Sequence, residues 1–214
     1  MKKGKFIVVE GLDGSGKATQ VNLLVEVLRG RGEEVEVIDF PQYEKKSSGL
    51  IEEYLSGKYG SAKEVGPKIA SIFYACDRYD ASFKIKKWLE DGKLVIADRY
   101  VSSNAGHQGG KIKKESERRE FLEWLYDLEY GLFGLPRPDK IIFLKTTPEF
   151  SIKAIKEKKG KDIHEKDKEH LKGAYEVYNY LAKNEKNFET VEVSRDGEFL
   201  SPEAINERIL KLIS

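Results

Sequence analysis

The most informative stretch of the sequence is GLDGSGKAT, residues 11–19, because its glycines and lysine have the spacing of a loop that binds phosphate groups. The glycines let the backbone turn tightly and direct its N–H groups inward, and Lys17 can reach the β- and γ-phosphates of a nucleotide. An apolar segment, KFIVVE, precedes the loop and a helical pattern follows it, so that a helix N-terminus would face the anion. The sequence therefore predicts a nucleoside triphosphate site formed by Gly11, Gly14, Ser15, Gly16, Lys17, Ala18 and Thr19.

Position 18 departs from the usual pattern, in which a serine or threonine follows the lysine and its hydroxyl holds Mg²⁺. Thr19 does not simply substitute for that hydroxyl, because one residue rotates the helix by about 100°. Mg²⁺ keeps several waters and takes further ligands from phosphates. Ala18 therefore predicts a metal held through water, with Asp98 or Glu10 in its outer shell, and does not argue against nucleotide binding.

Apolar runs alternate with amphipathic stretches along the whole chain of 214 residues. The patterns predict strands at 5–10, 34–40, 94–98, 140–145 and 189–194, and helices at 17–31, 48–56, 66–90, 114–130, 148–158, 165–184 and 201–213. A polar loop is expected between the third strand and the helix at 114–130. Strands separated by helices favour a three-layer α/β fold of the P-loop NTPase type, with five parallel strands in one domain, 1–214, and ligands at their carboxyl ends.

The bulk composition excludes several classes of partner. Lys plus Arg number 38 and Asp plus Glu number 37, so we expect neither nucleic acid nor a membrane as the main partner. Cys76 is the only cysteine and falls in an apolar helical pattern, which predicts a core position and fits a reducing, cytoplasmic location. No signal peptide and no stretch long enough to span a membrane is visible.

Five segments together resemble the thymidylate kinase family, in the family's order and approximate spacing across nearly the whole chain. They are FIVVEGLDGSGKATQ, FPQY (40–43), FYACDRY (73–79), DRYVSSNAGHQ (98–108) and DIHEKD (162–167). The resemblance implies transfer of the γ-phosphoryl group of ATP to dTMP, giving dTDP and ADP, with Mg²⁺, in a homodimer. It also implies that the charged segment at about 156–168 is a lid; taken alone, that segment is equally compatible with a solvated helix surface.

The resemblance gives roles to individual residues. Lys17, Arg99, Asp98 and Asp13 form the catalytic group: Arg99 grips the acceptor phosphate, Asp98 organises the magnesium shell, and Asp13 lies near both nucleotides. Tyr74 stacks on thymine, Arg78 donates to its O4, and Asn104 reads the pyrimidine edge. His107 lies near the sugar, where a hydrogen bond to a 2′-hydroxyl would loosen ribose discrimination. Phe40, Ser103 and Gln108 complete the dTMP site, and Arg195 flanks adenine.

Three departures from the family leave alternatives open. Gln42 and Tyr43 stand where an arginine is common, Lys145 ends the fourth strand in place of an aspartate, and the lid has no arginine. Its basic residues are lysines, with Lys158, Lys159 and Lys161 as candidates for the charge that stabilises the transferring group. A kinase of another nucleoside monophosphate or of a nucleoside is one alternative. A P-loop regulator that binds ATP without phosphorylating an acceptor is the other.

Overall fold

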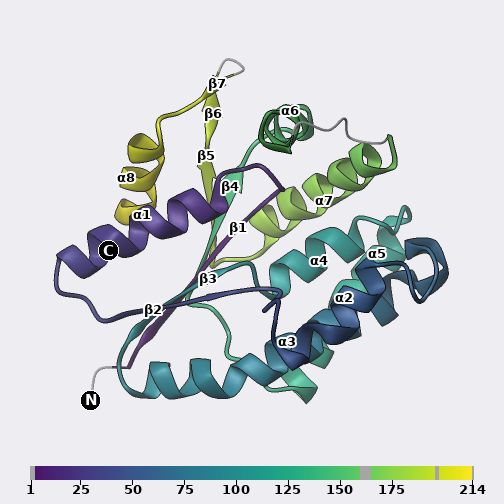
Figure 1. Ribbon diagram of the computed structural model, residues 1–214, viewed down its shortest axis with the longest axis horizontal. Helices are drawn as coiled ribbons and strands as arrows, with labels where there is room; N and C mark the ends of the chain where they lie inside the picture. Colours follow the sequence, from purple (N-terminus) through teal and green to yellow (C-terminus); the bar gives the residue numbers. More distant parts are fainter. Residues whose placement is uncertain (1–2, 160–164, 196–197, 214) are drawn as a thin grey trace.

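Five parallel strands form one sheet in the computed structural model, which describes residues 3–159, 165–195 and 198–213 (Figure 1). The strands are β1 (Lys5–Gly11), β2 (Val35–Asp39), β3 (Leu94–Asp98), β4 (Lys140–Lys145) and β5 (Phe188–Glu192), in the order β2-β3-β1-β4-β5. A short antiparallel pair, β6 (Ser194–Arg195) and β7 (Glu198–Phe199), follows β5. The predicted α/β fold class and its five strands are confirmed.

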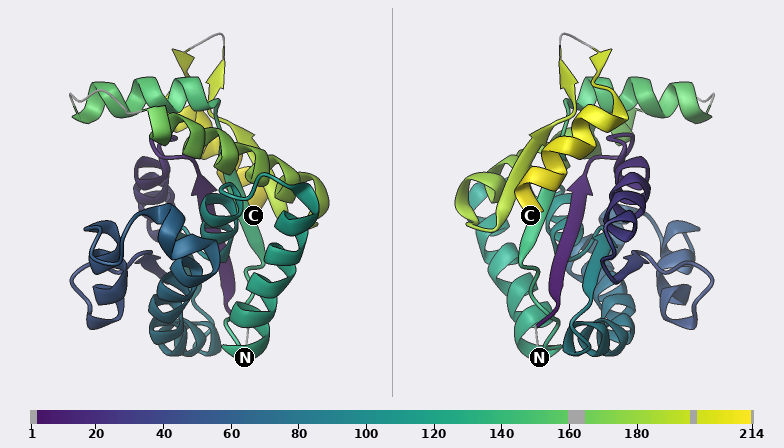
Figure 2. Two further views of the ribbon diagram at one scale, coloured as in Figure 1. Left: turned by 90° about the vertical axis from the view of Figure 1, so that its right-hand side faces the viewer. Right: turned by 90° about the vertical axis from the view of Figure 1, so that its left-hand side faces the viewer.

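Helices cover both faces of the sheet, and the two views in Figure 2 look onto those faces in turn. One face carries α1 (Lys17–Gly30) and α8 (Pro202–Ile213), while the other carries α3 (Ala62–Glu90), α4 (Val101–Gly109), α5 (Glu115–Tyr126) and α7 (Glu165–Asn184). The remaining elements are η1 (Lys46–Ser48), α2 (Gly49–Leu55), the π-helical turn η2 (Asp127–Leu132) and α6 (Pro148–Lys159).

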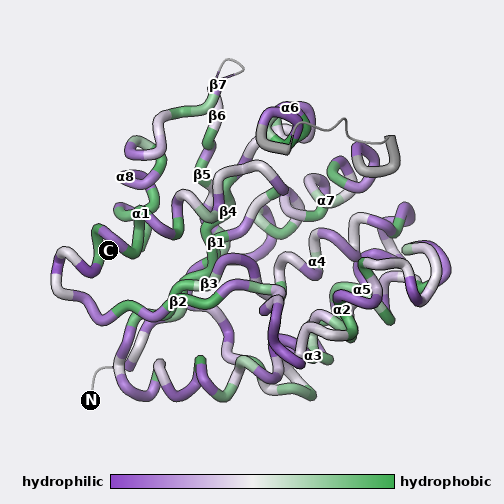
Figure 3. The backbone as a smooth tube through the Cα atoms, viewed as in Figure 1, coloured by the Kyte–Doolittle hydropathy of each residue, from purple (hydrophilic) through white to green (hydrophobic). Residues whose placement is uncertain are grey.

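The alternation of side chains along β1 explains why the sheet needs helices on both faces. Phe6 and Val8 belong to the apolar core beneath α3, α4 and α7, whereas Ile7 and Val9 belong to the core beneath α1 and α8. Figure 3 shows the strands as the most hydrophobic part of the backbone. In the strand order, β1 lies between β3 and β4, so the chain connections on its two sides run in opposite directions. Ligands of such folds bind at this switch point, at the carboxyl ends of the strands.

The predicted polar loop after β3 was wrong, because residues 101–109 form helix α4, and all of them except His107 are buried. Gly106 and Gly110 let α7 approach closely: a Cβ at Gly106 would lie 2.9 Å from the ring of Tyr178. The serines and Asn104 give α4 the polar composition of a loop. They are nevertheless buried, because they form hydrogen bonds with buried groups elsewhere in the fold. Among the described residues, no helix combines the length and the apolar character needed to cross a membrane.

Candidate active site

The phosphate loop joins β1 to α1, as the sequence predicts. A Cβ at Gly11 would lie 2.6 Å from the Ser15 hydroxyl and 2.7 Å from the Leu144 carbonyl, so only glycine fits there. Gly16 caps α1 in the left-handed region, with φ of 88°. The Lys17 ammonium donates to the carbonyls of Gly11 at 3.1 Å and Leu12 at 2.9 Å. The lysine thus lies folded over the loop whose backbone would cradle phosphate.

The charge on Lys17 is sensitive to its surroundings. Burial, and then the positive charge of Arg99, lower the pKa of Lys17 to about 8, although Asp13 and Asp98 partly offset these effects. An anion bound beside the lysine would favour its charged form.

Arg99 connects the loop to the end of β3. Its backbone has φ of 70°, which is rare for a residue other than glycine and is a form of strain that recurs at functional sites. Its guanidinium pairs with the Asp13 carboxylate and lies 3.4 Å from the Ser103 hydroxyl. Burial opposes ionisation of Asp13, but the charges of Arg99 and Lys17 prevail and hold the pKa of Asp13 well below its usual value. Arg99 and Asp13, which are far apart in the sequence, therefore meet at this edge of the sheet.

Asp98 offers an oxygen to a cation. Its Oδ1 is buried and has no hydrogen-bond partner within the described ranges. Burial raises the pKa of Asp98, with Lys17 and Arg99 opposing the rise. No three acidic, histidine or cysteine side chains gather into a metal cluster in the described part of the chain. This arrangement fits Mg²⁺ that takes most of its ligands from phosphates and water.

Glu10 has a different task from the one its sequence position suggested. It is completely buried, and its Oε1 accepts from the Tyr100 N–H at 2.9 Å and the Ser102 hydroxyl at 2.8 Å. Its Oε2 accepts from the Ser103 hydroxyl at 2.7 Å and the Tyr178 hydroxyl at 2.8 Å. Because both oxygens are engaged by protein donors, Glu10 anchors the start of α4, and the metal role expected for it is not supported.

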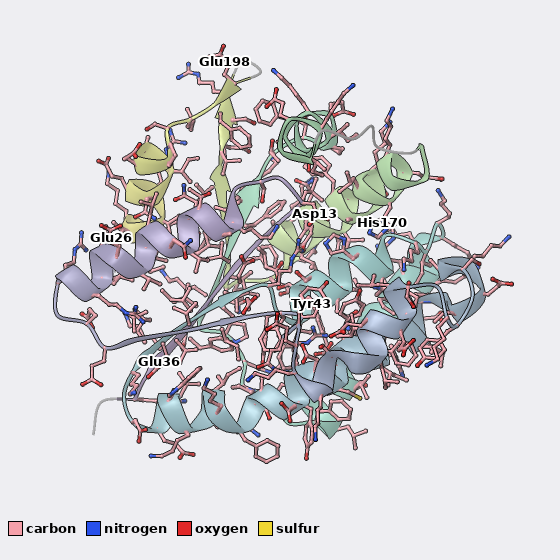
Figure 4. All side chains as sticks on the ribbon, viewed as in Figure 1. Asp13, Glu26, Glu36, Tyr43, His170 and Glu198 are labelled. Atoms are coloured by element: carbon pink, nitrogen blue, oxygen red, sulfur yellow. The ribbon has the colours of Figure 1, made fainter. Side chains whose placement is uncertain are left out.

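A cavity of about 830 Å³ opens beside the loop. Asp13, Tyr43 and His170, which are labelled in Figure 4, are among the residues that line it. All nine residues predicted to bind the second nucleotide line it: Asp13, Phe40, Tyr74, Arg78, Arg99, Ser103, Asn104, His107 and Gln108. They come from the phosphate loop after β1, the segment after β2, α3, the residue after β3, and α4.

Glu129, a residue for which the sequence predicted no role, holds two of these residues. Its Oε2 accepts from Arg78 Nε at 2.5 Å and its Oε1 from Arg78 Nη2 at 2.7 Å. The same Oε1 accepts from Asn104 Nδ2 at 3.0 Å. Burial alone would lower the pKa of Arg78, but the Glu129 charge raises it, so the guanidinium stays charged. The sequence did little to single it out, because Glu129 is one of two carboxylates, with Asp127, in the aromatic stretch WLYDLEYGLF.

His107 uses both of its ring nitrogens inside the protein. Arg99 Nη1 lies 3.2 Å from Nε2, and His170 Nε2 lies 3.1 Å from Nδ1. A guanidinium can only donate, so Nε2 accepts and Nδ1 carries the proton. Burial, and then the charge of Arg99, lower the pKa of His107 well below its ordinary value. The expected hydrogen bond from His107 to a 2′-hydroxyl therefore has no free nitrogen to make it.

The contacts of Gln42 and Lys145 explain two of the positions at which the chain differs from the family. The backbone N–H of Gln42 donates to the buried Asp77 carboxylate at 2.8 Å, and its side-chain amide lies 3.3 Å from the same group. Gln42 thus fastens its loop to α3, while Tyr43 lines the cavity with half of its surface exposed. Lys145 pairs with Glu192 at 2.8 Å on the neighbouring strand β5.

Some predicted site residues stay apart from this cluster or cannot be placed. Ala18 and Thr19 lie exposed on the first turn of α1, and Arg195 lies in β6, outside the cavity lining. Lys161, and the side chains of Lys158 and Lys159, lie outside the described residues.

Comparison with known proteins gives one family. The family model for thymidylate kinase matches residues 9–203. A thymidylate kinase of Plasmodium falciparum is 32% identical over 181 residues, covering 85% of this chain and 79% of the relative. One from Mycobacterium tuberculosis is 30% identical, covering 83% and 85%, and the human one is 30% identical, covering 67% and 62%. The family model covers most of the chain and the relatives are about 30% identical, so the chain belongs to the thymidylate kinase family.

Proposed function

We propose that this chain transfers the γ-phosphoryl group of ATP to dTMP, giving ADP and dTDP, as its family membership indicates. The observation that carries the assignment is the cavity that gathers all nine predicted acceptor residues next to the phosphate loop. A P-loop regulator has no need for such a second site. The reaction requires two nucleotides held in line, exclusion of water, and stabilisation of charge on the transferred group.

The donor site is the loop. Its backbone N–H groups and Lys17 hold the phosphates of ATP, and Arg195 is our candidate for a contact with adenine. Mg²⁺ fits beside the phosphates, where Asp98 would hold one of its waters, and it would neutralise charge on the phosphate oxygens. The contacts of Glu10 remove it from this set, and Ala18 supplies no ligand.

The acceptor site is the cavity. Arg99 grips the phosphate of dTMP through its planar fork, and Asp13 keeps that fork in place. Tyr74 stacks on the base, while Arg78 and Asn104 face its polar edge. No side chain acts as a general base, because the attacking phosphate is already an anion. Lid lysines 158, 159 and 161 are our candidates for the remaining charge on the transferring group.

A homodimer is supported by one stripe on α3. Ile69, Ile72, Cys76, Tyr79 and Phe83 follow alternating spacings of three and four, as in helices that pair along a seam. Ile69, Tyr79 and Phe83 are 49%, 43% and 61% exposed. The stripe is centred on Cys76, so a second, antiparallel copy of α3 would match it across a two-fold axis. This exposure also modifies the prediction of a core cysteine, since Cys76 is only half-buried.

The dimer is tested by sedimentation. Phe83→Glu should give monomers at concentrations where the wild type is dimeric, and Phe199→Glu should not, because Phe199 is an exposed phenylalanine in β7, away from the stripe. The cytoplasmic location predicted from the sequence stays a prediction.

An acceptor panel tests the function. With ATP and Mg²⁺, ADP should form when dTMP is added, more slowly with dUMP, and far more slowly with dCMP, AMP or thymidine. Equal use of dCMP or AMP would leave a kinase of another monophosphate. ADP production that ignores every added acceptor would instead favour the regulator.

A further inference from the structure

The ion pair between Arg78 and Glu129 is buried, and burying two charges costs free energy. Arg78 and Glu129 side chains are 3% and 0% exposed, and removing two charges from water is expensive even when they meet. Apolar residues of similar volume often fill such positions at equal or better stability. The pair therefore needs an explanation other than stability, and its place in the wall of the acceptor cavity suggests one.

The backbone that carries Glu129 is also unusual. It lies in the π-helical turn η2, where Phe133 N–H bonds back to the Leu128 carbonyl at 2.9 Å and Leu135 N–H to the Glu129 carbonyl at 3.0 Å. These bonds span five and six residues rather than four. The widened turn changes the direction in which the residues after α5, Glu129 among them, present their side chains. Such turns occur frequently at functional sites.

The hydrogen bonds of Glu129 fix the direction of the Asn104 amide. Both hydrogens of Asn104 Nδ2 are used, one on Glu129 Oε1 at 3.0 Å and one on the Ser71 carbonyl at 3.1 Å. Turning the amide over would place its oxygen against those same two acceptors. Asn104 Oδ1 is buried and has no hydrogen-bond partner within the described ranges, although the residue lines the cavity. This unsatisfied oxygen is the acceptor that Asn104 has left for a donor group bound in the cavity.

The same carboxylate fixes Arg78. Nε and Nη2 both donate to Glu129, which leaves Nη1 as the guanidinium nitrogen that Glu129 does not use. The cavity wall thus presents a donor from Arg78 next to an acceptor from Asn104. Thymine has the complementary pair, an N3–H donor beside the O4 acceptor, whereas cytosine has an N3 acceptor beside an amino donor.

We propose that Glu129 is a positioning residue that sets the base selectivity of the acceptor site. It holds a donor of Arg78 and an acceptor of Asn104 in the arrangement that is complementary to the O4 and N3–H groups of thymine. The inference rests on the proposed use of dTMP. Glu129 touches neither nucleotide in this account; it acts through the two side chains that do. Without it, the Asn104 amide can turn over and offer a donor to cytosine N3, so that the site loses its ability to reject the wrong base.

Steady-state kinetics with dTMP and dCMP provide the test. Glu129→Gln keeps the shape of the side chain but removes the charge and one acceptor. We expect the KM for dTMP to rise about tenfold to a hundredfold, with a smaller change in kcat and none in the KM for ATP. The ratio of kcat/KM for dTMP over dCMP should fall at least tenfold.

Two further variants separate positioning from stability. Glu129→Asp keeps the charge but shortens the side chain, so it reaches Arg78 or Asn104 and not both; we expect an intermediate ratio, and it decides the matter if the glutamine variant does not fold. Glu185→Gln is the control, because Glu185 is a partly buried carboxylate that accepts from Tyr126 in the same region and does not line the cavity. It should leave the ratio unchanged.

The outcomes distinguish this inference from the function on which it rests. A folded Glu129 variant with the wild-type ratio would overturn the positioning role, even if both rates fell equally. A wild type that does not phosphorylate dTMP would refute the proposed function itself.

Discussion

The phosphate loop and the acceptor cavity hold their polar groups in different ways. In the loop, Lys17 donates to carbonyls of its own segment, five and six residues away, and a bound phosphate can replace those contacts. In the cavity, Arg78 and Asn104 are fixed by Glu129, which lies 51 and 25 residues away in the sequence. The loop therefore suits any polyphosphate, whereas the cavity is built in advance for one pattern of donors and acceptors.

Buried carboxylates provide that advance organisation. Glu10 fastens the start of α4 to β1, and Glu129 fixes the side chains that project from α3 and α4 into the cavity. Glu10 accepts four hydrogen bonds and Glu129 accepts three, and a buried carboxylate with so many partners is rigid, because movement would leave its charge without them. Under the proposed function, donor binding would depend on local backbone and acceptor recognition on long-range polar contacts.

The largest expected effect is on the donor side. Lys17→Ala should lower kcat by a hundredfold or more, because it removes a charge preorganised for the transferring phosphoryl group. Binding of dTMP, measured by calorimetry, should change little. Near-normal turnover in a folded variant would rule out the role of the phosphate loop.

Glu10→Gln should mainly affect stability. It replaces an acceptor of four hydrogen bonds with a group that must place an NH₂ against one pair of donors, at a cost of about 3 kcal/mol in the free energy of unfolding. Urea denaturation measures this loss. The Mg²⁺ concentration for half-maximal activity should stay the same, and a marked increase would return Glu10 to the metal site.

The lid lysines should matter together. Neutralising Lys158, Lys159 and Lys161 to glutamine should lower kcat about tenfold with little change in the KM for dTMP, because flexible ammonium groups can replace one another singly. Single-turnover measurements separate this from slow product release. If the triple variant keeps wild-type kcat, the charge must come from elsewhere, with Arg99 the first candidate.

The pH dependence should differ between free and bound protein. Because burial and Arg99 lower the pKa of Lys17 to about 8, kcat/KM for ATP should fall as pH rises above about 8. Bound phosphates favour the charged lysine, so kcat should fall only at higher pH. If kcat/KM for ATP and kcat fell at the same pH, Lys17 would not be the titrating group.

The smallest effect is expected at position 18. Ala18→Thr places a hydroxyl on the exposed first turn of α1, where it fits sterically, and should lower the Mg²⁺ requirement by less than tenfold. The wild type should still need a divalent cation, and full activity in excess chelator would show that the metal assignment is wrong.

The sequence by itself determined the features that depend on neighbouring residues: the five strands, the loop with its tight glycines, and the alternation of strands and helices that produces a parallel sheet. It also supplied nine of the residues that line the cavity, but only through resemblance to a family. Only the tertiary structure decided that residues 101–109 form a buried helix, that Glu10 anchors α4, and that both nitrogens of His107 are engaged. It also revealed Glu129, whose partners Arg78 and Asn104 lie far away in the sequence, on α3 and α4. The role of a buried polar side chain is set by its partners, and here those partners arrive from strands and helices distant in sequence.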